Sequence, residues 1–474
     1  MDRRPAKPPP PAPRCLCASA YHISGRKKRP LLSALAKLCY RRCRVRSPRN
    51  GWREEDDEKG DGAMPVLKKT GLHYGWAVLA VVTLAVFCAL GLARFAYAMV
   101  LPAMQAALGM NNTQAGLLAT FNMAGYLIFV LLGGALSTRY GARLVVFIGL
   151  GFVGLGMIGT GMAEGFLSVS VWRTLTGIAT GGANIAAMGL LSSWFSNRRR
   201  GLASGVAVAG SSFALILTGR FVPWVGALQG ADAWRACWIV FGCVSMLAAL
   251  VAWLVLRNRP SDMGLGAIGD EESLRAESAK PAEAICWADI YLSAPVWSLG
   301  LIYSAFGFSF IIYMTFFFKF LIQDAGYTEP AAGALFMVVG WVSLSCGVIW
   351  GSVSDSVGRK KALIIVFLIH AIAFGFFGAG DAPVWFTMSA VLYGLSAWSV
   401  PAIMNAACGD LLGPRLAPAA LGFITLFFGV GTFLGPAVGG MIADAAGAFS
   451  PAFLLASAVA LLGAAGSAVL IKGK

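Results

Sequence analysis

Apolar stretches of about 20 residues repeat from Gly75 to the end of the chain, and they constrain its fold more than any other feature. A helix of that length crosses the hydrocarbon core of a bilayer, where every backbone amide and carbonyl must be hydrogen-bonded within the segment. Hydrophobic residues make up 58% of the 474 residues and charged residues only 13%, about half the charged share of a soluble protein. The sequence therefore predicts an all-α membrane protein.

The stretches predict twelve transmembrane helices in two six-helix, pseudo-symmetric bundles. A charged segment at 257–295 separates six stretches from the next six, and we interpret it as a cytoplasmic linker. The predicted N-terminal bundle covers 73–256 and the C-terminal bundle covers 296–474. The predicted spans are 75–99, 114–136, 143–162, 166–190, 202–225, 235–256, 296–320, 331–352, 362–380, 384–407, 419–442 and 452–471.

Residues 1–72 differ in composition from the rest of the chain. They are rich in proline, then basic, then acidic, and they hold 18 Lys and Arg against 7 Asp and Glu. We expect a disordered basic tail, which accounts for most of the net charge of +16 without a nucleic-acid partner. Met64 precedes a plausible short start, so residues 1–63 need not belong to the mature protein. Four tail cysteines have a spacing too irregular to predict a zinc site, and no cofactor is expected: Cys15, Cys17, Cys39 and Cys43.

Basic residues fall on one side of the predicted spans. Outer loops at 102–113, 161–166, 381–383 and 443–451 contain no Lys or Arg. This bias predicts that both termini are cytoplasmic, in a plasma (inner) membrane. The predicted inner loops contain Arg139, Arg143, Arg198, Arg199, Arg200, Arg257, Arg259, Arg359, Lys360, Lys361 and Arg415.

Two loops 217 residues apart share one pattern. The stretch at 134–143 reads GALSTRYGAR, and the stretch at 351–360 reads GSVSDSVGRK, with both glycines in register. The match indicates that a six-helix unit has been duplicated, as in transporters built from parallel repeats.

The second loop resembles the signature G-x-x-x-D-x-x-G-R-[KR] of the major facilitator superfamily, which lies between spans two and three and repeats between spans eight and nine. The first copy has Thr138 where the acid should be. Arg173 and Gly177 in span four resemble the family's R-x-x-x-G motif, and the ends of span six, around Trp234 and Arg257, resemble members that carry monocarboxylates and related organic anions. The resemblance covers 73–474 and implies a transporter that works by alternating access, not an enzyme.

The paired loops also predict gating residues. A carboxylate beside a helix end can pair with arginines and helix dipoles and so latch one conformation. Asp355 with Arg359 can form such a latch, whereas Thr138 cannot supply the charge. The alternative is that these residues only set topology. The predicted gating residues are Gly134, Arg139, Gly141, Arg143, Gly351, Asp355, Gly358 and Arg359.

Four basic residues fall within predicted spans, and no acidic residue lies mid-span to offset them. An arginine deep in a span costs roughly 2.5–3.5 kcal/mol, so it should face a partner or a watery cavity. A cavity with unbalanced positive charge attracts an anion. Asn184 is added because it shares span four with Arg173. The predicted substrate-binding residues are Arg94, Arg173, Asn184 and Arg220.

Each of these groups has an alternative role. Lys319 is interpreted as extending to the outer membrane interface rather than binding substrate, and Arg220 lies similarly close to an edge. Arg173 could instead pair with Glu164. His370 could relay protons, or it could hydrogen-bond to a neighbouring helix.

The function that the sequence favours is secondary active transport of a small, monocarboxylate-like organic anion, with proton co-transport as the drive. Efflux of an apolar or cationic drug is an alternative, but it predicts a buried acid in the cavity, and none is visible. A non-transporting sensor or receptor is a second alternative. A membrane enzyme is disfavoured because His370 is the one histidine in a predicted span. We expect a monomer whose partners are the bilayer and the solute; the substrate, direction and coupling ion are left open.

Overall fold

The computed structural model describes residues 73–269 and 290–470. The predictions for the tail at 1–72, including its four cysteines, and for most of the linker lie outside the described residues. Within the described ranges all regular structure is helical, apart from one isolated bridge between Phe195 and Ile268. That bridge holds the start of the predicted linker against the junction of two helices in the first half of the chain.

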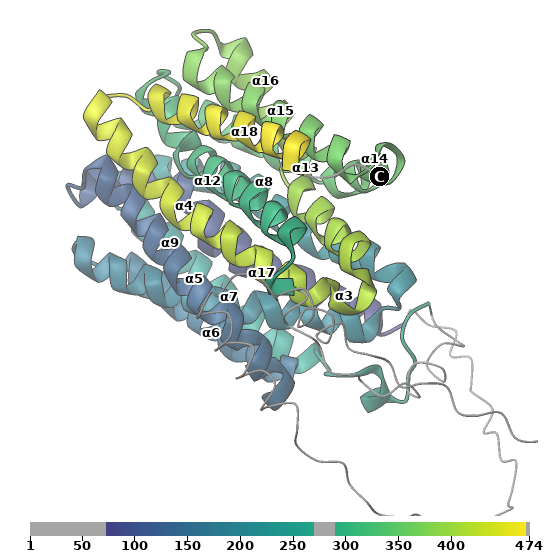
Figure 1. The fold of residues 1–474 in the computed structure, drawn as a ribbon. Coiled ribbons are helices and arrows are strands. Elements are labelled where there is room, and N and C mark those ends of the chain that lie inside the picture. The colour runs from purple at the N-terminus through teal and green to yellow at the C-terminus, as the bar shows by residue number, and fades with distance from the viewer. Residues whose placement is uncertain (1–72, 270–289, 471–474) are drawn as a thin grey trace, which may run out of the picture. The chain divides into compact units, whose positions relative to one another are not determined.

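The first half of the chain contains mostly long α-helices (Figure 1). They are α3 (Gly75–Val86), the π-helix η1 (Phe87–Phe95), α4 (Ala96–Ala107), α5 (Asn112–Tyr140), α6 (Ala142–Gly161), α7 (Phe166–Trp194), α8 (Asn197–Gln229), the short 3-10 helix η2 (Gly230–Asp232), α9 (Ala233–Val255) and the short 3-10 helix η3 (Pro260–Met263).

The second half has the same character. Its helices are α12 (Ala294–Gln323), α13 (Glu329–Ser343), α14 (Cys346–Val357), α15 (Arg359–Ala379), α16 (Pro383–Ser396), α17 (Ser399–Ala446) and α18 (Ser450–Leu470).

Ten helical segments within the described residues are long and apolar enough to cross a membrane. One of them, 199–255, contains both α8 and α9, and α13 is apolar but shorter, at 15 residues. The prediction of an all-α membrane protein is confirmed at this level.

Three predicted boundaries differ from the structure. The predicted loop at 408–418 is helical, because α17 runs from Ser399 to Ala446 without a break. The predicted span 331–352 is two helices, α13 and α14, and the predicted span 75–99 extends to Ala107 through a π-helical segment. Apolarity marks the part of a helix that lipid surrounds, whereas the helix itself continues past that part, here through a segment that contains Gly413, Pro414 and Pro418.

Each half packs within itself, and the halves meet along three helix pairs. In the first half α5 packs on α7 and α6 on α9; in the second half α12 packs on α17 and α15 on α18. Figure 1 shows α15, α16 and α18 together, apart from α5, α6 and α7. The contacts between the halves are α5 with α17, α8 with α13, and α4 with α12.

Glycines let these helices approach closely. A Cβ atom added at Gly177 on α7 would lie 1.9 Å from the carbonyl oxygen of Asn122 on α5. A Cβ added at Gly156 on α6 would lie 2.3 Å from Thr176 Oγ1 on α7. Small residues at helix contacts are the usual means of tight packing in a membrane, where apolar side chains gain little by leaving lipid.

The two similar loops have the same backbone turn. Gly141 has φ of 86° and ψ of 142°, and Gly358 has φ of 87° and ψ of 151°. Each glycine is both the C-cap of one helix and the N-cap of the next. A positive φ at these two places is a conformation that side chains with a Cβ rarely adopt, so the repeated glycine has a direct structural reason.

We expect Gly177→Ala to destabilise the protein, because the new methyl group would collide with the α5 backbone. Overpacking of this kind costs about 1–3 kcal/mol. Gly189→Ala on the same helix is the matched control, since its Cβ would meet nothing within 4 Å. The melting temperature of detergent-purified protein should fall by about 3 °C or more for Gly177→Ala and should not fall for Gly189→Ala. Equal melting temperatures would contradict the proposed α5–α7 contact.

Candidate functional site

Arg94 lies near the end of the π-helical segment η1, which interrupts the first span. π-helical segments are rare in proteins, and those that occur often lie at functional sites. The wider turn changes the direction of the side chains that follow it. The side chain of Arg94 is 9% exposed, so its guanidinium is inside the protein. The sequence predicted that this arginine would lie in the interior but not the π-helix that presents it.

The guanidinium of Arg94 is surrounded by aromatic rings and has few polar partners. Its Cζ atom lies 5.6 Å from the ring centres of Phe95 and Tyr126 and 6.0 Å from that of Phe310. Its Nε and Nη2 atoms are buried without a hydrogen-bond partner among the described residues. Since Phe310 belongs to α12 and Tyr126 to α5, the charge lies where the two halves of the chain meet.

Arg173 is more completely buried, at 1% exposure, and better held. Its Nη1 donates a hydrogen bond of 2.8 Å to the carbonyl oxygen of Ala93, the residue before Arg94. Its Cζ lies 4.6 Å from the ring centre of Tyr97 and 5.0 Å from that of Trp238. The alternative ion pair between Arg173 and Glu164 is wrong: neither residue takes part in an ion pair within the described residues.

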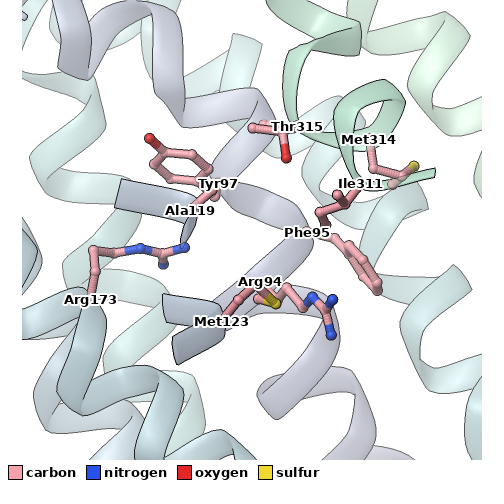
Figure 2. Close-up of a pocket in the computed structure, with 10 residues that line it drawn as sticks. Arg94, Phe95, Tyr97, Ala119, Met123, Arg173, Ile311, Met314 and Thr315 are labelled. Carbon is pink, nitrogen blue, oxygen red and sulfur yellow. The ribbon is translucent and has the colours of Figure 1, made fainter. Parts of the chain in front are cut away.

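Arg94 and Arg173 line the same small cavity (Figure 2). Its volume is about 10 Å³, enough for about one water molecule, so the halves are closed around it. In Figure 2 the guanidinium of Arg173 points toward Tyr97, and that of Arg94 points away from Arg173. The other lining residues are Phe95, Tyr97, Ala98, Ala119, Met123, Ile311, Met314 and Thr315, of which the last three come from α12.

The structure does not bring the other two predicted binding residues to this cavity. Asn184 is half-buried on α7, and Arg220 is exposed on α8. Neither residue lines the cavity that contains Arg94 and Arg173.

Two further polar residues of the spans have contrasting partners. Asn122 ties α5 to α7, because its Nδ2 donates a 2.9 Å hydrogen bond to the carbonyl oxygen of Arg173. His370 on α15 is fully buried, and neither of its ring nitrogens makes a hydrogen bond of normal geometry within the described residues. A looser hydrogen bond joins its ring to the backbone of Ser396 on the neighbouring helix α16. Its ring also stacks on Phe306 and Phe374, at 5.7 and 5.6 Å between ring centres.

The interpretation of Lys319 as a side chain that extends to the membrane interface is wrong. Its side chain is 0% exposed, and its Nζ donates hydrogen bonds to Gln105 Oε1 and Asn112 Oδ1. Lys319 lies on α12, while Gln105 and Asn112 lie on α4 and α5. Amide oxygens from the other half of the chain therefore replace water as hydrogen-bond acceptors for this ammonium group.

Asp444, near the end of α17, completes the same contact. Its Oδ1 accepts a 2.9 Å hydrogen bond from the amide of Asn112, and its Oδ2 accepts bonds from the amide and hydroxyl groups of Thr113 at 2.7 and 2.5 Å. The carboxylate thus caps the N-terminus of α5, where the helix dipole favours negative charge. We call Gln105, Asn112, Thr113, Lys319 and Asp444 the polar lock, because together they join the two halves at one end.

A second cavity, of about 280 Å³, lies at the same end, between α4, α8 and α9 on one side and α12 and α13 on the other. Its walls are mainly apolar, and Glu329 is its one charged lining residue. This cavity is therefore poorly suited to an anion.

At the opposite end, Arg359 lies between two carboxylates of its own half. Its Nη1 is 2.5 Å from Asp355 Oδ1, and its Nε donates a 2.9 Å hydrogen bond to Asp410 Oδ2 on α17. Nη1 also donates to Ser354 Oγ. The ion pair expected between Asp355 and Arg359 is present, and it ties α14 and α15 to the beginning of α17.

The first copy of this loop is held without an acid, as the threonine at 138 requires. The Nε and Nη2 atoms of Arg143 donate to the carbonyl oxygen of Trp253 at 2.9 and 2.6 Å, near the C-terminus of α9. The amide of Arg143 donates to Asn258 Oδ1.

The other predicted gating residues make few contacts. Arg139 is exposed beside Tyr140. Gly134 and Gly351 face open space, with nothing within 4 Å of an added Cβ. A gating role for these residues stays a prediction.

Sequence reasoning missed the acids and amides at the ends of the helices. Asp444 fell in a predicted outer loop and Asp410 in a predicted inner loop, although both lie on α17. The available signal was a pairing requirement: a lysine in an apolar span needs partners, and Gln105 and Asn112 are polar residues on the same predicted side of the membrane.

Ten helical segments of the described residues are long and apolar enough to cross a membrane, and cations are buried where the two halves meet, as a multi-pass membrane transporter requires. Residues 86–468 match the family described as "Uncharacterised MFS-type transporter YbfB". The chain belongs to this family of the major facilitator superfamily, and it is a transporter rather than an enzyme.

Individual proteins show the same likeness. The chain is 25% identical over 382 residues to the hexuronate transporter of Bacillus subtilis, which covers 78% of this chain and 88% of that protein. It is 27% identical over 355 residues to monocarboxylate transporter 13 of Rattus norvegicus, covering 72% and 75% of the two chains. The crystal structure of a D-xylose-proton symporter has the same fold, with a TM-score of 0.67 at 16% identity, over 84% of this chain and 98% of that one.

We expect Lys319→Met to loosen the polar lock and separate the two halves at that end. The distance between spin labels on cysteines introduced at Ala106 and Ala446, both exposed, measures the separation. Serine first replaces the exposed Cys243 and the cysteines outside the described residues, which are Cys15, Cys17, Cys39, Cys43 and Cys286. The variant should populate longer distances because the amide oxygens lose their charged partner. Asp381→Asn, which removes an exposed charge from the 380–382 loop of the second half, is the control and should leave the distances unchanged. Identical distributions for Lys319→Met and the parent would show that the lock does not hold the halves together.

Proposed function

We propose that the protein is a secondary active transporter of small organic anions, in which Arg94 binds the anionic group of the solute. The observation that carries the proposal is the state of its guanidinium, which is buried where the two halves meet and has two nitrogen atoms without a hydrogen-bond partner among the described residues. None of the ion pairs within the described residues includes Arg94.

An unpaired buried cation is costly, and a ligand of opposite charge removes that cost. Burial without a hydrogen bond is unfavourable by several kcal/mol for a charged group. A carboxylate can accept two parallel hydrogen bonds from a guanidinium, which is among the strongest polar contacts in proteins. A solute carboxylate is therefore a fitting partner for the Nε and Nη2 atoms of Arg94.

Arg173 supports the site in two ways in this proposal. Its bond to the carbonyl oxygen of Ala93 holds the π-helical segment, and hence Arg94, in place. Its position on the same cavity adds a second positive charge that attracts the solute. Asn184 and Arg220 stay predicted binding residues whose positions, off this cavity, give them no further support.

The relatives support an anionic solute. The names of two of them specify hexuronate and monocarboxylate transport, and both kinds of solute carry a carboxylate. The relatives share about a quarter of their residues with this chain, so the common feature to carry over is the charged group rather than the whole solute.

Alternating access is the proposed mechanism. Twelve spans form two six-helix bundles, 73–256 and 296–474, which rock about the solute in a plasma membrane with both termini in the cytoplasm. In this orientation the polar lock closes the outer end, and Thr120 on α5, which donates to the carbonyl oxygen of Phe433, continues that closure inward.

Arg94→Ala should abolish transport of carboxylates. The variant loses the charged hydrogen bonds, worth about 1.5–3 kcal/mol each, so initial uptake of labelled gluconate or pyruvate into proteoliposomes should fall by about 10-fold to 100-fold. Lys361→Ala, which removes an equal charge at an exposed site, is the control and should retain uptake. Undiminished uptake by a folded Arg94→Ala protein would refute the anion-site assignment.

Proton coupling makes a separate prediction. If protons drive the transport, an inward proton gradient should raise the initial rate of carboxylate uptake several-fold, and an uncoupler that dissipates the gradient should remove the increase. Solute accumulation that does not depend on the proton gradient but does depend on a sodium gradient would identify sodium as the coupling ion. The proposed role of Arg94 would be unaffected.

A further inference from the structure

Three tyrosines from both halves of the chain lie around Arg94. Tyr126 is on α5, Tyr303 on α12 and Tyr393 on α16. The ring of Tyr126 contacts the guanidinium directly, and Tyr303 and Tyr393 are connected to it through the rings of neighbouring residues. Their phenols add polar groups to the aromatic and aliphatic side chains of this region.

Ring contacts connect the tyrosines to the arginine. Tyr126 lies directly beside the guanidinium, at 5.6 Å from Cζ to the ring centre. Tyr303 stacks on Phe428 at 4.7 Å and on Phe306 at 6.1 Å between ring centres. Phe306 in turn stacks on Phe310, which lies beside Arg94. The tyrosines therefore belong to one continuous aromatic wall that begins at the arginine.

Tyr393 is attached to the same wall through His370. Their ring centres are 5.6 Å apart, and His370 stacks on Phe306. Tyr393 is 0% exposed, and its hydroxyl oxygen has no hydrogen-bond partner among the described residues.

Tyr393 differs in this respect from two other buried tyrosines, whose hydroxyl groups are paired within the protein. The Tyr313 hydroxyl forms a 2.8 Å hydrogen bond with Ser389, and the Tyr97 hydroxyl donates a 2.6 Å bond to the carbonyl oxygen of Ala115. A buried hydroxyl without a partner costs about 1–3 kcal/mol, so its presence beside a binding residue calls for a ligand group that completes it.

We propose that Tyr126, Tyr303 and Tyr393 select carboxylates whose carbon body carries hydroxyl groups over hydroxyl-free carboxylates of the same length. The inference rests on the proposed anion site at Arg94 and adds the solute class to it. Arg94 holds the carboxylate, and the phenols exchange hydrogen bonds with hydroxyl groups further along the solute. The aromatic faces of the wall pack against its C–H groups.

The physical reason for selection is the penalty for leaving the buried Tyr393 hydroxyl unpaired. A site built to hydrogen-bond a hydroxyl group rejects the analogue that lacks it, because the buried protein groups then have no partner. If the wall were only an apolar surface, the preference would be reversed, since burying hydroxyl groups against hydrocarbon is unfavourable.

The test compares two six-carbon monocarboxylates of equal charge, gluconate and hexanoate. Affinity is measured by isothermal titration with the purified full-length protein. We expect gluconate to bind at least about tenfold more tightly than hexanoate. Tyr303→Phe combined with Tyr393→Phe should weaken gluconate binding by about tenfold and change hexanoate binding less than about twofold.

Tyr313→Phe is the matched control. It removes a buried phenol of the same aromatic cluster, but one whose hydroxyl is already paired with Ser389. Its gluconate-to-hexanoate ratio should equal that of the parent protein. Each variant removes a single oxygen atom per site, and unchanged melting temperatures establish that it is folded.

The outcomes separate this inference from the proposed function. Equal or tighter binding of hexanoate by the parent protein, with both affinities lost in Arg94→Ala, overturns hydroxyl selection and keeps the anion site. Parent-like selectivity in the double phenylalanine variant overturns the assignment to Tyr303 and Tyr393. Failure of the parent protein to bind either acid overturns both proposals.

Discussion

Positive charge inside segments that lipid surrounds, held without an ion pair among the described residues, is the constraint on which the interior of this protein depends. A cation in such a place must find oxygen atoms or aromatic faces, because water and lipid headgroups are out of reach. Arg173 finds a carbonyl oxygen and two rings. Lys319 finds two side-chain amides of the opposite half. Arg173 keeps one buried nitrogen, Nε, without a partner, whereas Arg94 has two, Nε and Nη2, beside aromatic rings, and that difference is what makes Arg94 the candidate for binding solute.

The same constraint links the binding site to the contact between the halves. The bond from Arg173 to Ala93 fixes the π-helical segment from within the first half, while Phe310 and the α12 residues of the cavity come from the second. Lys319 lies on that same α12 helix, two turns beyond the cavity residue Ile311, and reaches the first half through the polar lock. A movement of α12 therefore acts on the lock and on the wall of the site together.

The two similar loops share backbone geometry more closely than chemistry. Gly141 and Gly358 adopt nearly the same positive φ, because the turn between two antiparallel helices requires it in both halves. The charged partners have diverged: Arg359 pairs with two carboxylates, whereas Arg143 binds a carbonyl oxygen at the end of α9. Carbonyl groups at a helix C-terminus carry partial negative charge and can replace an acid, which explains how the first loop keeps its arginine with Thr138 in the acidic position.

The sequence by itself determined the membrane-spanning helices, the repeated glycine turns and the burial of Arg94 and Arg173, because apolar length, glycine and intramembrane charge each have one dominant physical consequence. Only the tertiary structure decided which cation is left unpaired, since that depends on which oxygens other helices bring near. In the structure Lys319 is buried in the polar lock rather than at the predicted membrane interface, and Arg220 is exposed. The sequence does not show this difference, because burial at a helix end depends on contacts between segments that are distant in the chain. It also placed Asp444 against α5, 332 residues away in sequence from its partner Asn112, a pairing that no local pattern encodes.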